Sequence, residues 1–218
     1  MVSSFNRRSS RNRWFLPSIV AFAIALSLSS CGSYAGKTGS PRPTNSKPAN
    51  PVRIDSSTIS TDVSLSADTT VDSSSVTFKY NLTNDSANAI WAVYPSTVSA
   101  LPDGAGGVIA AMAFFPVRED LSYAQPPYER VTKLEPKQSV EEKVLVNRPF
   151  TIRHDVKPGA DALPSKPTSV RLCIGYVEAH KLPANQPEKI SENKYKINRD
   201  TGYQLQKKFA CSSPTPLN

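Results

Sequence analysis

The two histidines of this chain are its residues best suited to acid–base or metal chemistry. His154 is followed by Asp155, a pair that in a hydrolase would serve as a base and its orienting carboxylate, whereas His180 has no such neighbour. No second ligand lies at metal-binding spacing from either histidine. The sequence also lacks a G-x-S-x-G motif or a comparable nucleophile element. We therefore expect no catalytic centre, no metal site and no cofactor.

The carboxylates do not form a site either. Glu141 and Glu142 are adjacent in a stretch that alternates like a strand, so their side chains are expected on opposite faces. Asp68 and Asp72 bracket a turn without the ligand series of a calcium loop. Chemistry by paired carboxylates is thus not predicted.

The first residues have the organisation of an export signal. Residues 5–13 carry four arginines and no acid, and residues 14–30 are mostly apolar but too short and too rich in serine for a transmembrane helix. The stretch ends in Leu28-Ser29-Ser30-Cys31, which resembles the lipobox of bacterial lipoproteins. An ordinary signal peptide with a chance cysteine, or a signal anchor, is the alternative.

The resemblance implies a lipid anchor. In that family the cysteine thiol receives a diacylglyceryl group, signal peptidase II cleaves before it, and the new amine is often acylated. Cys31 would then be the lipidation site and the first mature residue, and two or three acyl chains would hold it stably in a membrane. The following Gly32, where an aspartate would favour retention at the inner membrane, implies the outer membrane facing the periplasm in a Gram-negative cell. In other bacteria it implies the outer face of the cell membrane.

A flexible linker is expected at 31–57, where Ser, Pro, Gly, Thr, Asn and Lys dominate. The chain has a net charge of +8, but seven of these charges belong to residues 1–51, which contain no acid. The remainder is close to neutral and has no electrostatic footprint for nucleic acid. The expected partners are a membrane, through the anchor, and an envelope protein or glycan.

Alternation of apolar and polar residues then predicts a β-domain. The pattern is clearest over 59–66 and 76–83, and the run 87–94 is expected to return as the second strand of a hairpin. Further strands are expected at 108–115, 128–135, 139–147, 168–179 and 202–211. The set predicts an all-β antiparallel sandwich of about seven to eight strands over 58–212, with 213–218 as a tail. With Trp91 on the third strand, the pattern resembles immunoglobulin-like domains.

Cys173 and Cys211 remain after Cys31 is assigned to lipid. Both lie late in candidate strands of an exported domain, where disulfides persist, so we expect them to be bridged; two free thiols are the alternative. The alternation of side chains argues against a direct cross-strand pair. Leu172 and Ile174 are expected to face the core, so Cys173 between them is expected to point outward. A bulge near Lys207-Lys208 would be needed.

These features favour a lipid-anchored envelope lipoprotein whose domain is a non-enzymatic binding or structural module. A protease-inhibitor-like interaction domain is the alternative, and an envelope hydrolase is the third. The proline-rich segments 148–167 and 181–201 read as long loops that are either a binding edge or plain surface excursions. Tyr123, Tyr128 and Pro126-Pro127 either line an exposed groove or pack.

Overall fold

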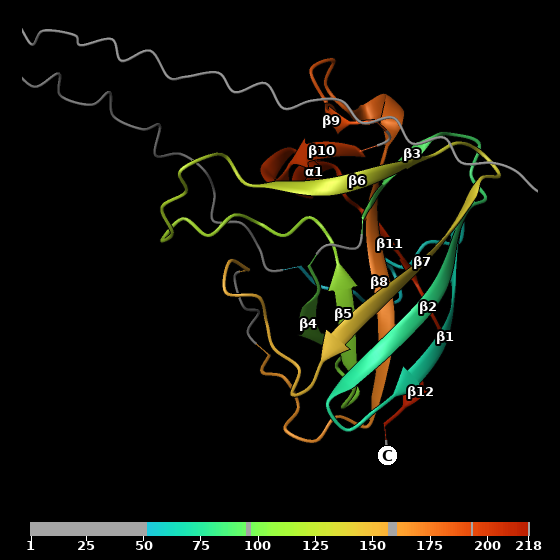
Figure 1. Ribbon diagram of the computed structural model, residues 1–218, viewed down its shortest axis with the longest axis vertical. Helices are drawn as coiled ribbons and strands as arrows, with labels where there is room; N and C mark the ends of the chain where they lie inside the picture. Colours follow the sequence, from blue (N-terminus) through green and yellow to red (C-terminus); the bar gives the residue numbers. More distant parts are fainter. Residues whose placement is uncertain (1–51, 95–96, 157–160, 193, 218) are drawn as a thin grey trace, which may run out of the picture. The chain divides into compact units, whose positions relative to one another are not determined.

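The fold is an all-β sandwich made of two sheets packed face to face, as the sequence predicts (Figure 1). A computed structural model describes residues 52–94, 97–156, 161–192 and 194–217. The smaller sheet is antiparallel, in the order β1-β2-β7. Its strands are β1 (Val63–Val71), β2 (Ser75–Asn84) and β7 (Ser139–Asn147). Prediction and structure agree on β7 to the residue, and burial alternates along its whole length.

The larger sheet has nine strands, with β4-β5-β8-β3-β6-β10-β9 as its main path and with β11 and β12 also paired to β8. Its strands are β3 (Ile90–Val93), β4 (Ser99–Pro102), β5 (Val108–Met112), β6 (Tyr128–Leu134), β8 (Ser169–Glu178), β9 (Glu188–Ser191), β10 (Lys194–Asn198), β11 (Lys208–Cys211) and β12 (Thr215–Pro216). Two short helices interrupt it, η1 (Ala179–Lys181) and α1 (Arg199–Leu205). The β5–β8 pair is parallel, so the sheet is mixed rather than antiparallel throughout.

Strand β8 is the centre of the larger sheet. Cys173 and Ile174 pair with both β5 and β11, so these two strands lie on opposite edges of β8. Tyr176 pairs with both β3 and β11, which places β3 on the same edge as β5, farther along. Gly175 lies on β8 between Ile174 and Tyr176, and a Cβ there would collide with the side chain of Gln206. The Gln206 Oε1 accepts the backbone N–H of Phe114 at 3.0 Å, which satisfies a donor just beyond the end of β5.

Two hydrophobic clusters form because both faces of β8 are buried. The main core lies between the sheets and combines side chains such as Phe78 and Leu82 with Leu172 and Ile174. Trp91 belongs to it, is 6 % exposed, and meets Tyr195 edge to face at 4.9 Å between ring centroids. The second cluster lies on the other face of the larger sheet. Its buried members are Ile54, Leu101, Ile109, Ala111, Ala113, Phe115, Val156, Cys173 and Phe209.

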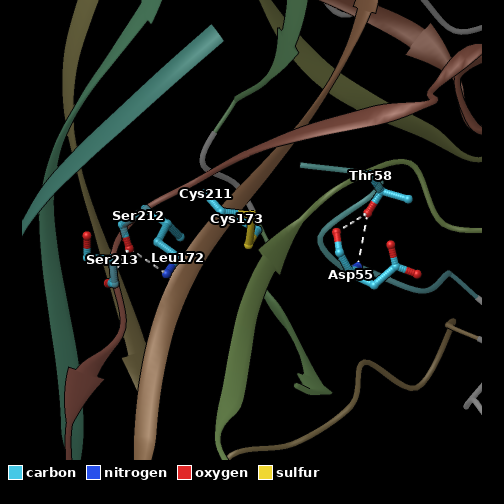
Figure 2. The surroundings of a disulfide bond; sticks show 7 residues. All are labelled: Asp55, Thr58, Leu172, Cys173, Cys211, Ser212 and Ser213. Atoms are coloured by element: carbon cyan, nitrogen blue, oxygen red, sulfur yellow. Dashed lines mark hydrogen bonds between the residues drawn. A yellow bond between two sulfur atoms is a disulfide. The ribbon is translucent and has the colours of Figure 1, made fainter. Parts of the chain in front are cut away.

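The disulfide between Cys173 and Cys211 is present, which confirms that prediction (Figure 2). The two residues are directly opposed in the β8–β11 ladder, and their Cα atoms are 4.1 Å apart. No bulge is needed, because Cys173 faces the second cluster rather than solvent and is fully buried. Next to the bridge, Leu172 donates its backbone N–H to Ser212 Oγ at 3.1 Å, which continues the connection between the two segments.

The predicted hairpin of 76–83 with 87–94 is wrong. Strand β3 pairs with β6 and β8 in the other sheet, so the chain crosses between sheets after β2. Asn84, fully buried, holds this crossing: its Nδ2 donates to the carbonyls of Asn88 and Leu134, and its Oδ1 accepts from Ser86. A residue at the end of β2 whose side chain bonds to the backbone of the connection and of β6 fixes a corner rather than a hairpin turn.

The strand predicted over 202–211 is also wrong in its first half, which is helical. Asn198 caps α1, since its Oδ1 accepts the backbone N–H groups of Asp200 and Thr201. Gly202 is buried against the ring of Phe114, where any Cβ would collide. The Asn198 cap and the packing of Gly202 on Phe114 together favour a helix over the strand that the alternation of Tyr203 and Leu205 predicted.

The segment 181–201 is not a long loop. It contains η1 in part, the β9–β10 hairpin and the start of α1, so the expectation of an unstructured excursion is wrong there. The sequence did not reveal β9, because this strand is exposed at every position, whereas the alternating pattern requires one buried face. Within the described residues, no helix has the length and apolarity to cross a membrane.

Candidate functional site

Among the described residues, no hydrogen bond joins the side chain of either histidine to a nucleophilic side chain. His154 lies exposed in the segment after β7, and its carbonyl accepts a hydrogen bond from Arg118 at 2.8 Å. The adjacent Asp155 turns away into the protein. His180 sits exposed in η1 with its Nε2 3.4 Å from a carboxylate oxygen of Glu178. In the described residues, no group of three or more His, Cys, Asp or Glu side chains is placed to hold a metal ion.

Four buried charges form the most unusual polar cluster of the domain. Arg153 donates to both oxygens of Asp155 at 3.0 and 2.8 Å and to Glu129 Oε1 at 3.2 Å. Arg199 lies on the other side, 3.1 Å from Glu129 and 2.8 Å from Asp155. The four side chains are between 3 % and 12 % exposed. Two cations and two carboxylates thus neutralise one another away from water. We call these residues the charge cluster.

The pKa values of the two carboxylates in the charge cluster shift in opposite directions. Burial raises the pKa of Glu129 and outweighs the opposing charges of Arg153 and Arg199. Burial also acts to raise the pKa of Asp155, but the hydrogen bonds and charges of the two arginines outweigh it and lower the pKa to about 2. Asp155 is therefore held as a carboxylate, and its two oxygens are bound by Arg153 and Arg199 rather than by the side chain of His154.

The charge cluster connects three segments that are distant in the sequence. Glu129 comes from β6, Arg153 and Asp155 come from the segment after β7, and Arg199 is the first residue of α1. A buried cluster of this kind costs much to assemble, but removing one member leaves an uncompensated charge. It therefore fixes the relative positions of β6, α1 and the first part of the 148–167 segment.

A groove of about 300 Å³ lies directly beside the charge cluster. Its lining residues are Gln125, Pro126, Pro127, Tyr128, Gln186, Glu188, Lys196 and Asn198. Tyr128 is 42 % exposed, one of the few large hydrophobic side chains at the surface of the described residues. The Lys196 Nζ lies 4.9 Å from the centroid of its ring and 3.0 Å from Glu188 Oε1. The groove thus offers an aromatic ring, a proline pair, one cation and one carboxylate.

The walls of the groove are held by backbone contacts. Tyr128 and Asn198 are directly paired between β6 and β10, and each precedes a member of the charge cluster in sequence. The Arg199 N–H donates to the carbonyl of Pro127 at 3.0 Å, and the Asn198 N–H donates to Gln186 Oε1 at 3.2 Å. The groove is therefore built on a framework that the buried charges keep in place.

The sequence left open which of the tyrosines and prolines near residue 125 line an exposed groove and which pack against the protein, and the structure distinguishes them. Tyr128 and Pro126-Pro127 line the groove, whereas Tyr123 is half-buried and its hydroxyl is buried without a hydrogen-bond partner among the described residues. Of the two long segments, 181–201 contributes groove residues and also Arg199 of the charge cluster, while 148–167 contributes Arg153 and Asp155. Cys31 lies outside the described residues.

Sequence reasoning missed the charge cluster, because it treats charged side chains as solvent-exposed. One signal was available: Glu129 shares its strand face with Val131, on the apolar side of the alternation. A second was Asn198 followed by Asp200, an N-terminal helix signature that places Arg199 at the start of a helix.

Comparison with known proteins adds no relative: the chain matches no protein-family model, no curated protein and no solved structure.

Proposed function

We propose that this protein is a bacterial envelope lipoprotein, anchored through Cys31, whose β-sandwich is a non-enzymatic binding module. The anchor rests on the sequence Leu28-Ser29-Ser30-Cys31 after a basic and an apolar segment. The Cys173–Cys211 disulfide supports an exported domain, because disulfides persist in oxidising compartments.

The binding surface that we propose is the groove at Tyr128. The observation that carries it is a solvent-exposed tyrosine ring in a hollow whose walls are fixed by a buried four-charge cluster. Tyrosine presents a large contact area with few rotatable bonds, which makes it effective in recognition. Proline and a fixed cation–carboxylate pair beside it add rigidity and orientation. The partner class that fits is an envelope protein with an extended segment.

The anchor is tested by replacing Cys31 in the full chain. Cys31→Ala is expected to shift the protein from the membrane fraction to the soluble fraction or to leave it unprocessed. Mass spectrometry of the wild-type N-terminus should show an acylated cysteine. An unmodified wild-type chain that begins elsewhere would reject the anchor.

The groove is tested by crosslinking in intact cells. A photoreactive amino acid at Tyr128 should capture one defined partner, and the same probe at the exposed Lys166, away from the groove, should not. Tyr128→Ala, in a chain without the probe, should abolish co-purification of that partner while leaving the thermal unfolding midpoint nearly unchanged. Equal capture from both positions would reject the groove as the binding surface.

A further inference from the structure

A wide hollow of about 570 Å³ opens on the smaller sheet, far in sequence from the groove residues. Its lining residues Ser66, Asp68, Lys79, Asn81, Glu141 and Lys143 are polar, and they alternate along their strands with Ala67, Tyr80 and Glu142, which also line it. The neighbours of these residues along each strand, such as Leu82 and Val144, belong to the main core. Because side chains alternate across a strand, the polar set lies on the outward face. We call it the polar face.

The strand register arranges the polar face in two rows. In one row Asn81, on the middle strand β2, stands between Ser66 and Glu141. In the next row Lys79, also on β2, stands between Asp68 and Lys143. All six side chains therefore project from paired strands, which position them more rigidly than loops would.

Two like charges are directly opposed on the polar face. Lys79 and Lys143 are directly opposed between β2 and β7, an arrangement that destabilises a sheet. None of the four charged side chains forms an ion pair with another described residue, although Asp68 and Glu141 stand in the neighbouring positions. A bound anion would relieve the repulsion between these two opposed lysines.

Asn81 supplies a second, independent observation. It lines the hollow at the centre of the sheet, and its Oδ1 is buried without a hydrogen-bond partner among the described residues. An unsatisfied buried acceptor costs free energy. A ligand hydroxyl that reached the amide as it reoriented would recover that cost.

We propose that the polar face binds a glycan that carries carboxylate groups. The ligand carboxylate would lie between Lys79 and Lys143, and its hydroxyls would donate to Asp68 and Glu141. The cores of protein–protein interfaces are depleted in charged side chains and enriched in aromatic ones, whereas this hollow is lined by five charged residues. Nucleic acid requires a surplus of positive charge, whereas the acidic residues that line this hollow outnumber its two lysines.

This site is independent of the proposed groove, because the two lie on different sheets and share no residue. Binding at the polar face is therefore measured with the full chain and does not depend on finding a partner for Tyr128. The probe is an oligogalacturonate, and its methyl ester serves as the matched ligand, since esterification removes the charge and keeps the hydroxyls of the ring.

Isothermal titration calorimetry is expected to show binding of oligogalacturonate and at least tenfold weaker binding of the methyl ester. Lys79→Met and Lys143→Met should each weaken the binding of oligogalacturonate at least tenfold, whereas Lys166→Met, at an exposed position, should bind it like wild type. The unfolding midpoints of both polar-face variants should equal or exceed that of wild type, which separates lost contact from lost fold.

Four results would overturn the proposal. They are undetectable binding of oligogalacturonate, equal binding of its methyl ester, equal loss with Lys166→Met, or a loss caused by Tyr128→Ala with none caused by Lys79→Met. The last result would assign the glycan to the groove and leave the polar face without a ligand.

Discussion

The two sheets of this domain are stabilised by different kinds of contact. The three-stranded sheet pairs long strands in unbroken register and exposes one whole face to solvent. The nine-stranded sheet consists mostly of short strands, buries β8 on both faces, and holds its β6–β10 end with four buried charges. The first sheet depends on local alternation, whereas the second depends on contacts between residues far apart in the chain. Substitutions of the buried charged residues at the β6–β10 end of the second sheet should therefore be costly, and substitutions of the exposed charged residues of the first should be nearly free.

The largest effect is expected from breaking the charge cluster. Arg199→Met leaves Glu129 and Asp155 with a single arginine in a buried site, and we expect about 3–5 kcal/mol less free energy of unfolding. Chemical denaturation of the purified protein measures this. The double variant Glu129→Gln/Arg199→Met, which removes one charge of each sign, should recover part of the loss. A loss below about 1 kcal/mol for Arg199→Met would contradict this account of the larger sheet.

The disulfide is expected to be next in size. Cys173 and Cys211 are 38 residues apart, and the chain-entropy relation for a loop of that length gives about 4 kcal/mol as an upper value. The double variant Cys173→Ala/Cys211→Ala should lower the denaturation midpoint strongly. Wild type with reductant should approach the same midpoint, because both treatments remove the same constraint. A midpoint unaffected by reductant and by the double variant would mean that pairing of β8 with β11 alone fixes this region.

A pH-dependent effect should follow from Asp155. Its pKa in the folded protein is lowered to about 2, below the ordinary value, so the stability it contributes is present above about pH 4 and is lost as pH falls toward 2. The difference in unfolding free energy between wild type and Asp155→Asn should shrink by about 2 kcal/mol over that window. Glu129 acts with the opposite sign, because its raised pKa favours the protonated folded state at low pH. A difference that stays constant from pH 5 to pH 2.5 would contradict the assignment.

The smallest effect is expected on the polar face, and its sign is reversed. Lys143→Thr removes one of two directly opposed lysines and introduces a residue that favours strands, so we expect a gain of about 0.5 kcal/mol. Thermal unfolding measures it, and raising the salt concentration should reduce the gain as repulsion is screened. A clear loss of stability would show that Lys143 makes a stabilising contact and would weaken the case for a ligand between the two lysines.

Alternation by itself determined the strands that have one buried face and one exposed face. Phe78, Tyr80 and Leu82 alternate with polar residues, so β2 and the adjoining β7 could be placed from the sequence, and the cysteine count after Cys31 led to the bridge between Cys173 and Cys211. These are properties of neighbouring residues or of residue type, and they do not depend on which strands meet.

Tertiary structure decided the rest, because the remaining elements respond to partners distant in the chain. Strand β3 joins the larger sheet because buried Asn84, at the end of β2, bonds to the carbonyl of Leu134 in β6, and α1 forms where Gly202 must pack on Phe114. Glu129 and Arg199 are buried only because each meets the other's charge across 70 residues of sequence. The sequence records their types, but the low-dielectric site that makes them a pair exists only when the two sheet segments are assembled.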